Sequence, residues 1–261
     1  MRMEYLPDSW NKLVDVFLST SVFVFLDYDG TLTPIVDKPE NAVLSAESMR
    51  VLRRLRDKYC VGIVSGRSLE DVRSLVGVSG IYYAGNHGLE VSGPKINSKA
   101  LGFERFRPVI REICSNLKSS LGDVDGVLVE DKGLTASIHY RLVSERDRGR
   151  VEGDFWNLVG GYVDSGDVKV TSGKMVFEIR PSVDWDKGRA VKWVVDSAGG
   201  GDSLIVYFGD DRTDEDVFRR LGEGDVGVLV SEDEGIESGA GYFLRDVDEV
   251  IEFLSVLSRL E

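Results

Sequence analysis

Two aspartates follow an apolar run near the start of the chain, at a spacing that could support catalysis. The run Val22–Leu26 is rich in β-branched and aromatic residues and is followed by DYDGT, which contains Asp27 and Asp29. Such a run predicts a strand buried on both faces, and open α/β sheets bind ligands at the carboxyl ends of such strands. Two carboxylates this close repel each other unless a cation or a shared proton holds them. The pattern favours a Mg²⁺ site with one carboxylate free for nucleophilic or acid–base chemistry, although a strand that ends in a polar turn would look the same.

A second apolar run ends in residues that could bind phosphate. Tyr59–Val64 predicts another strand, and it is followed by Ser65, Gly66 and Arg67. Ser68 then fits the N-cap of a helix. A hydroxyl and the backbone N–H groups between a strand end and a helix start form a natural cradle for phosphate. The alternatives are strand-end polarity for Ser65 and a solvated arginine at a helix start for Arg67.

Two further motifs in the last third of the chain carry a lysine and more carboxylates. A helix is predicted to begin near Asp186, which places Lys187 in its first turn. The strand predicted at Ser203–Phe208 is followed by GDDRTDED, which contains Asp210 and Asp214. Carboxylates at the ends of two parallel strands can converge on one Mg²⁺, and a lysine beside them can bind phosphate. Each motif is weak evidence alone, but all of them together, in this order, predict a site for phosphate chemistry.

One of the two histidines follows another predicted strand. Ile81–Ala84 is a short apolar run, and His87 comes after it between Gly85 and Gly88. A lone histidine is usually structural, but a histidine at a strand's carboxyl end can also reach a ligand bound there. Both interpretations stay open on the sequence alone.

The elements that must position these residues fall into two groups. In residues 1–102 and 182–261, apolar strands alternate with amphipathic helices, which is typical of an α/β parallel sheet. Residues 103–181 follow the order helix, hairpin, helix, hairpin, which predicts a small α+β unit with an antiparallel sheet. Because this stretch interrupts the alternation, we predict a discontinuous α/β core with an inserted α+β domain.

Length and composition exclude several classes of protein. The chain has 261 residues, of which 42% are hydrophobic and 30% charged, as in a soluble globular protein. The formal net charge of −13 argues against a nucleic-acid partner and against an anionic membrane surface. The two cysteines, Cys60 and Cys114, lie far apart, and we expect buried thiols in a reducing compartment. With no signal peptide or membrane span in the pattern, we expect a cytoplasmic monomer that acts on a small molecule.

The four motifs resemble those of the haloacid dehalogenase (HAD) superfamily of aspartate-nucleophile phosphotransferases. The matching positions are DxDGT at 27–31, Ser65, Lys187 and GDDxTDxD at 209–216. The resemblance implies a Rossmann-like parallel-sheet core in which Asp27 attacks phosphorus and Asp29 acts as general acid and base. It further implies that Thr31 and Ser65 bind the phosphoryl group, and that Lys187 pairs Asp27 with it. Arg67 is a further candidate for binding the phosphoryl group, with a solvated arginine as the alternative.

The same resemblance implies the metal site and the class of reaction. Mg²⁺ is expected on the Asp27 carboxylate, the Asp29 carbonyl and Asp210, with Asp211 and Asp214 orienting that shell. An alkoxide leaving group needs a proton, which Asp29 can supply, whereas a halide does not. The resemblance therefore favours a phosphatase over a dehalogenase.

Longer blocks resemble the trehalose-6-phosphate phosphatases: LDYDGTLTPI, SGR, GNHGLE, GKMVFEIRP, DKGRA and GDDRTDEDVF. This implies hydrolysis of trehalose 6-phosphate, with the inserted domain as a substrate-specifying cap. The candidate sugar-binding residues are His87, Glu90, Arg141, Lys174 and Glu178. Because related sugar phosphatases share the core, sucrose phosphate and mannosyl- or glucosyl-3-phosphoglycerate are alternative substrates. A non-catalytic sugar-phosphate-binding domain and a phosphomutase or phosphotransferase are alternatives of other classes.

The last strand of the inserted domain has a polar face. In the stretch 174–180, Met175, Phe177 and Ile179 alternate with Lys174, Val176, Glu178 and Arg180. The first set predicts a core face and the second either a solvated face or a surface that binds the sugar.

Overall fold

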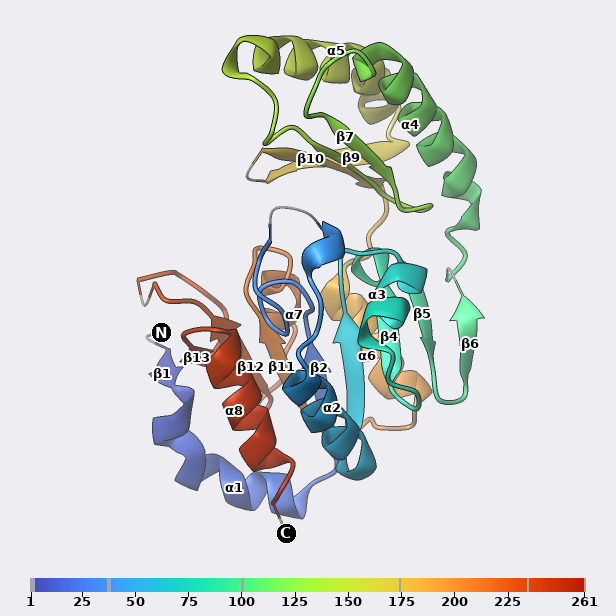
Figure 1. Ribbon diagram of the computed structural model, residues 1–261. Helices are drawn as coiled ribbons and strands as arrows, with labels where there is room; N and C mark the ends of the chain where they lie inside the picture. The colour runs from blue at the N-terminus through green and yellow to red at the C-terminus, as the bar shows by residue number, and fades with distance from the viewer. Residues whose placement is uncertain (1–2, 37–38, 100, 174, 234, 261) are drawn as a thin grey trace. The chain divides into compact units, whose positions relative to one another are not determined.

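A nine-stranded sheet lies at the centre of the larger of two units in the computed structural model, which describes residues 3–36, 39–99, 101–173, 175–233 and 235–260. The larger unit comprises Met1–Lys99 and Trp185–Glu261, and the smaller one comprises Ala100–Asp184 (Figure 1). The smaller unit is thus inserted between two stretches of the larger one. From the sequence we placed the two junctions at 102/103 and 181/182; the contacts place them at 99/100 and 184/185.

The strands of the large sheet follow the order β1-β13-β12-β11-β2-β3-β4-β5-β6. Neighbours are parallel from β1 to β4 and antiparallel from β4 to β6. The strands in this spatial order are β1 (Glu4–Tyr5), β13 (Tyr242–Leu244), β12 (Val226–Val230), β11 (Leu204–Gly209), β2 (Val22–Leu26), β3 (Cys60–Val64), β4 (Tyr82–Gly85), β5 (Glu90–Gly93) and β6 (Ile96–Lys99). The mixed α/β sheet with a parallel centre confirms the predicted fold class.

Helices cover both faces of this sheet because its central strands are apolar on both sides. Val24 and Leu26 of β2 face one core cluster together with the buried residues of α1, α2, α3 and α8. The ring of Phe25 faces the other side, where α6 lies behind the sheet in Figure 1. The helices of this unit are α1 (Trp10–Ser19), α2 (Ala46–Lys58), α3 (Leu69–Val76), α6 (Lys187–Ser197), α7 (Glu215–Phe218) and α8 (Val247–Leu257), with 3₁₀ turns η1 (Leu6–Ser9), η2 (Pro39–Asn41) and η3 (Asn86–Gly88).

The strand order places the predicted motifs together. β11, β2, β3 and β4 are consecutive neighbours, and all four are parallel. Their carboxyl ends therefore lie at one edge of the sheet, where Asp210, Asp27, Ser65 and Asn86 follow them. The backbone N–H of Asp27 donates to the carbonyl of Phe208 at 2.9 Å, so the first and last motifs are direct neighbours.

The smaller unit is a four-stranded antiparallel sheet with two helices on one face. Its strand order is β7-β8-β10-β9. The strands are β7 (Leu128–Asp131), β8 (Ala136–His139), β9 (Val168–Gly173) and β10 (Val176–Pro181); the helices are α4 (Arg107–Leu121) and α5 (Glu145–Asp164), preceded by η4 (Glu104–Phe106). The predicted alternation is confirmed along β10, because Phe177 and Ile179 are buried while Glu178 and Arg180 are half-buried on the opposite face. Lys174 lies outside the described residues.

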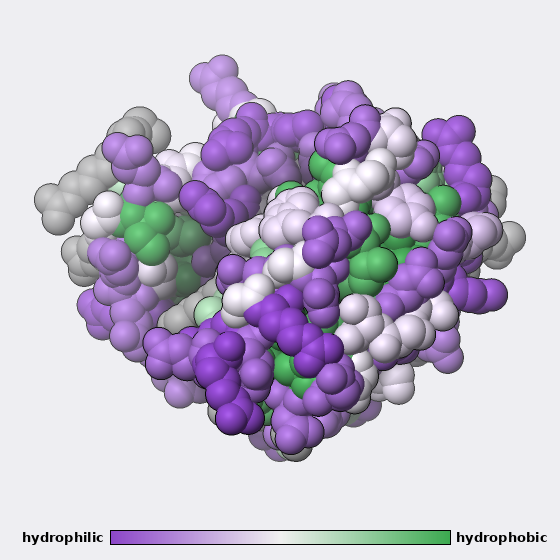
Figure 2. Space-filling view, turned by 90° about the horizontal axis from the view of Figure 1, so that it is seen from above, coloured by the Kyte–Doolittle hydropathy of each residue, from purple (hydrophilic) through white to green (hydrophobic). Residues whose placement is uncertain are grey.

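Some features differ from the predictions. The antiparallel strands β5 and β6 extend the sheet beyond β4, where we predicted no further strand, because GLEVSGP contains too short an apolar run to signal a strand. Cys114 is buried as expected, but Cys60 is exposed, since it begins β3 at the rim of the sheet. Hydrophilic residues dominate the face drawn in Figure 2. Within the described ranges, no helix combines the length and apolarity needed to cross a membrane.

Candidate active site

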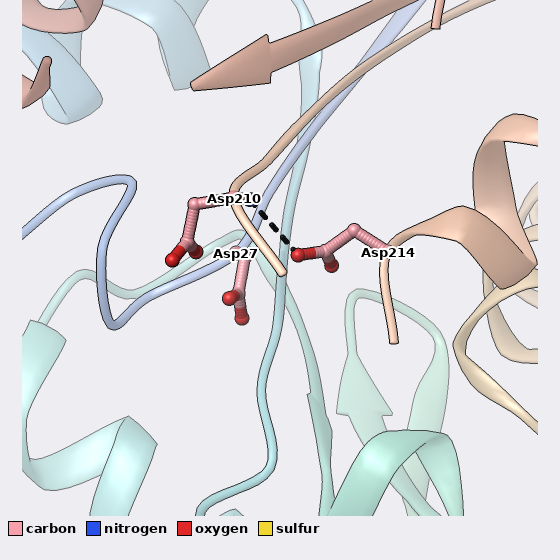
Figure 3. Close-up of side chains that lie close together, drawn as sticks. All are labelled: Asp27, Asp210 and Asp214. Atoms are coloured by element: carbon pink, nitrogen blue, oxygen red, sulfur yellow. Dashed lines mark hydrogen bonds between the residues drawn. The ribbon is translucent and has the colours of Figure 1, made fainter. Parts of the chain in front are cut away.

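Three carboxylates from two strand ends converge at the edge of the large sheet. Oxygens of Asp27, Asp210 and Asp214 lie within 4.8 Å of one another, and Figure 3 shows the three side chains gathered around one point. Asp27 is only 5% exposed and Asp214 is fully buried. Gly30 makes this approach possible, because its φ of +89° suits glycine and a Cβ there would lie 2.0 Å from Asp210 Oδ2. The sequence predicted all three of these carboxylates as metal-site residues.

Lys187 places a positive charge between two of these acids. Its Nζ lies 3.1 Å from Asp27 Oδ1 and 2.8 Å from Asp214 Oδ1, and its side chain is 2% exposed. The residue begins α6, whose N-cap Asp186 accepts a hydrogen bond from the Arg189 N–H at 2.9 Å. Burial alone would lower the pKa of the ammonium group, but Asp214 and Asp27 outweigh it and hold the pKa well above its usual value. Lys187 is therefore a permanent cation beside Asp27.

Asp214 holds this arrangement through four hydrogen bonds. Its Oδ1 accepts from Lys187 and from the hydroxyl of Tyr207 at 2.6 Å, and its Oδ2 accepts the N–H groups of Asp210 and Asp211 at 3.0 Å each (Figure 3 marks the bond to Asp210). With its oxygens used in this way, Asp214 serves to orient the other groups. Sequence reasoning missed Tyr207, because a tyrosine inside the apolar run of β11 looks like a core residue.

The pKa values of Asp27 and Asp210 show that the cluster favours an added positive charge. Burial raises the pKa of Asp27 well above its usual value, and the neighbouring acids raise it further against the opposing effect of Lys187. Burial, then Asp214 and Asp211, raise the pKa of Asp210 to about 7. Burial would also raise the pKa of Asp211, but Lys187 and two bonds from Thr213 keep it below its usual value. These groups offer only oxygen ligands, and the raised pKa values of Asp27 and Asp210 mean that a nearby positive charge would stabilise their ionised forms. Such a set of ligands fits a hard divalent cation such as Mg²⁺.

The carboxylate of Asp29 is held by Arg67. The guanidinium Nε and Nη2 each donate to the Asp29 carboxylate at 2.7 Å, while Arg67 also donates to Asp71 at 2.9 Å and to the Pro39 carbonyl at 2.9 Å. Arg67 is 7% exposed and its guanidinium lies over the ring of Tyr28. With four bonds to protein groups, Arg67 is placed to orient Asp29.

The two predicted phosphate hydroxyls lie near the same edge. Ser65 is fully buried, and its Oγ accepts the Arg67 N–H at 3.1 Å in the turn after β3. Thr31 Oγ1 lies 3.4 Å from Asp210 Oδ1, so it reaches the carboxylate cluster directly. Both side chains follow strands that are neighbours in the sheet, and their role toward phosphate stays a prediction.

The five residues predicted to bind sugar are divided between the two units. His87 and Glu90 lie in the larger unit after β4, where Glu90 Oε2 accepts from Asn86 Nδ2 at 2.6 Å. In the smaller unit, Glu178 pairs with Arg180, and Arg141 is exposed in the turn after β8. Lys174 lies outside the described residues, as noted above. A role for these residues in sugar binding stays a prediction.

Comparison with known proteins identifies the family. The family described as "Trehalose-phosphatase" matches residues 25–248 of this chain. The chain belongs to the trehalose-phosphatase family. It is 38% identical to "Probable trehalose-phosphate phosphatase 4" from Oryza sativa subsp. japonica, an alignment that covers 95% of this chain and 70% of that protein. It is also 38% identical to "Trehalose 6-phosphate phosphatase RA3" from Zea mays, with 91% and 70% covered.

Solved structures of the trehalose-phosphatase family share the fold. The C-terminal domain of trehalose-6-phosphate phosphatase from C. albicans superposes with a TM-score of 0.80 at 24% identity, covering 98% of both chains. A trehalose-6-phosphate phosphatase related protein gives 0.79 at 26% identity, covering 91% of this chain and 97% of the other. A haloacid dehalogenase-like hydrolase from Bacteroides thetaiotaomicron gives 0.63 at 15% identity, with 91% and 99% covered. These likenesses confirm the fold that the motif resemblance implied.

Proposed function

We propose that this member of the trehalose-phosphatase family is a Mg²⁺-dependent enzyme that hydrolyses trehalose 6-phosphate to trehalose and phosphate. The observation that carries the proposal is the buried pairing of Asp27 with Lys187 inside the carboxylate cluster. A carboxylate that is buried, flanked by an ammonium group and next to a candidate cation site is suited to attack an anionic phosphate ester. A purely sugar-binding domain would not need this arrangement.

Mg²⁺ would be held by Asp27 and Asp210, together with the Asp29 carbonyl that the motif resemblance implies. Asp214 and Asp211 would orient these ligands, because their own oxygens already accept hydrogen bonds from neighbouring groups. When bound, the ion supplies positive charge that offsets the repulsion between the nucleophile and the phosphate. Its binding would replace the protons that the raised pKa values of Asp27 and Asp210 retain.

The chain's own residues would perform two successive displacements at phosphorus. In the first, an Asp27 oxygen forms a bond to phosphorus while the bond from phosphorus to the sugar oxygen breaks. Lys187 stays beside Asp27 and stabilises the charge of the phosphoryl group, and Thr31 and Ser65 are placed to hold its oxygens. In the second, a water oxygen forms a bond to phosphorus while the bond from phosphorus to the Asp27 oxygen breaks, which releases inorganic phosphate and regenerates Asp27. Splitting phosphate-monoester hydrolysis in this way divides one of the slowest uncatalysed reactions into two easier steps.

Asp29 would carry the proton in both steps. Its carboxyl group gives a proton to the departing sugar oxygen and later takes one from the attacking water. The Asp29 side chain is 39% exposed, so it is accessible to a substrate, and Arg67 fixes its orientation. We therefore propose that Arg67 orients Asp29 and does not bind the phosphate.

The half-buried polar face of β10, with Glu178, is our candidate for contact with sugar hydroxyls, together with Arg141 and Lys174 of the same unit.

The function is tested by measuring phosphate release from a panel of sugar phosphates. We expect release from trehalose 6-phosphate that requires Mg²⁺ and yields free trehalose and inorganic phosphate in equal amounts. Glucose 6-phosphate and sucrose 6-phosphate serve as matched sugar phosphates and should react at least tenfold more slowly in kcat/KM. Faster hydrolysis of another sugar phosphate would overturn the proposed substrate, and transfer of phosphate to a sugar acceptor would indicate a phosphotransferase.

The Asp29→Asn variant should distinguish substrates by their leaving group. With trehalose 6-phosphate, the departing alkoxide needs a proton, so we expect a loss in kcat on the order of 10²–10⁴-fold. With p-nitrophenyl phosphate the leaving group needs no proton, so the first step should be spared and the loss should be clearly smaller. Single-turnover release of nitrophenol separates the two steps. Equal losses on both substrates would contradict Asp29 as general acid.

A further inference from the structure

The turn η3 between β4 and β5 has an unusual backbone. Asn86, His87 and Gly88 have φ values of +51°, +56° and +89°, three successive residues in the left-handed region. Non-glycine residues seldom adopt such angles, and a segment keeps them only when its surroundings enforce them. Asn86 is fully buried and His87 is 7% exposed, so the strained segment is an internal part of the unit.

One side of η3 is bonded to the turn that carries Ser65. The Asn86 N–H donates to the carbonyl of Arg67 at 2.6 Å, and the His87 N–H donates to the carbonyl of Ser65 at 2.9 Å. The His87 ring lies over Gly66, where a Cβ would be only 2.7 Å from the ring. These contacts fix η3 against the predicted phosphate-binding turn.

The other side of η3 is bonded to the start of α6, which carries Lys187. The indole Nε1–H of Trp185 donates to the Gly88 carbonyl at 2.8 Å. A Cβ on Gly88 would lie 2.3 Å from Ala190 Cβ and 3.4 Å from the carbonyl of the N-cap residue Asp186, so the two backbones are in close contact. η3 therefore touches both segments that carry the groups proposed to flank the phosphoryl site, the turn of Ser65 and the start of α6.

We propose that η3 is a brace that sets the spacing between the turn of Ser65 and the ammonium group of Lys187. Trp185 is a positioning residue that acts through Gly88, and Glu90 is a second one that acts through its bond to Asn86. This inference rests on the proposed function for its catalytic consequence. It also assigns Glu90 a role other than the sugar contact that the motif resemblance implies. Misplacing a catalytic group by a fraction of an ångström lowers the rate of reaction. A brace that holds this spacing would therefore maintain kcat.

The test uses Trp185→Phe, which removes the N–H donor and keeps an aromatic ring. Loss of one hydrogen bond should lower kcat about 3- to 10-fold, with KM changed by less than twofold. Because the brace acts on the phosphoryl site, the loss should be the same for trehalose 6-phosphate and for p-nitrophenyl phosphate. Trp193→Phe is the matched control, since Trp193 lies on α6, the helix that follows Trp185, and is half-buried. Its kcat should equal that of the unaltered protein.

Two outcomes would overturn the brace. A lower melting temperature with normal kcat would show that Trp185 only stabilises the fold. A loss confined to trehalose 6-phosphate, with a raised KM, would show that this segment contacts the sugar.

Amide hydrogen exchange of residues 186–194, measured without substrate, separates this inference from the proposed function. Exchange should be faster in Trp185→Phe than in Trp193→Phe. If the unaltered protein releases no phosphate from either substrate, the proposed function fails. Faster exchange would then still support the brace, and unchanged exchange would contradict it.

Discussion

Replacing Asp27 with asparagine is expected to abolish phosphate release while leaving the fold intact. An amide cannot attack phosphorus, so kcat should fall by a factor on the order of 10⁴ or more, as when other enzymes lose their nucleophile. The fold should survive because Lys187 keeps its partner Asp214 at 2.8 Å. Initial rates of phosphate release, with melting temperature as the check on folding, measure both effects.

Asp225→Asn is the matched control for this prediction. The same chemical change is made in the same unit, but Asp225 directly precedes β12, at the opposite end of the parallel strands. Its carboxylate accepts the N–H groups of Ile205 and Gly222 at 2.8 Å each, so the change alters local hydrogen bonding only. We expect kcat to remain normal. Comparable turnover in a folded Asp27→Asn protein would rule out the covalent mechanism.

Without a divalent cation, the protein should lose stability as the pH rises. Folding raises the pKa of Asp210 from about 4 to about 7, and that of Asp27 is also raised, so the folded state binds protons more tightly than the unfolded state. The free energy of unfolding therefore falls with rising pH, by up to about 1.4 kcal/mol per pH unit for each proton. Between pH 5 and pH 8 the loss should be on the order of 2 kcal/mol. Urea unfolding in the presence of EDTA measures it.

The Asp210→Asn variant separates the contribution of the carboxylate cluster to this pH dependence of stability from the contribution of the chain's other charges. Without metal, its stability should match that of the unaltered protein at pH 5 and exceed it at pH 8, because the amide never ionises. Millimolar Mg²⁺ should remove the pH dependence of the unaltered protein and have little effect on the variant. A metal-free protein whose stability is constant or rises over this range, or a variant with no advantage at pH 8, would refute the interpretation.

Sequence patterns predicted where the candidate catalytic residues lie. Three of the four motifs follow an apolar run that predicts a buried strand, so the α/β class could be predicted, and the break in the strand–helix alternation predicted the inserted domain. Parallel strands end at the same edge, which is why Asp27 and Asp210 could be expected to meet although 183 positions separate their numbers. Ser68 and Asp186 mark helix starts in the sequence, and each accepts a backbone N–H bond as an N-cap in the structure.

The tertiary structure alone decided how the supporting residues are used. Tyr207 sits in an apolar run and Trp185 at a strand–helix junction, and nothing local indicates that one bonds to Asp214 and the other to Gly88. The sequence left Arg67 open as a phosphate ligand or a solvated arginine, and only the structure shows its guanidinium bonded to Asp29, Asp71 and the Pro39 carbonyl. Sequence patterns indicate which residues of a single strand or helix are buried, because hydrophobic periodicity is a property of neighbouring residues in the chain. The partner of a buried polar group depends on which strands become neighbours, and that is fixed only when the sheet is assembled.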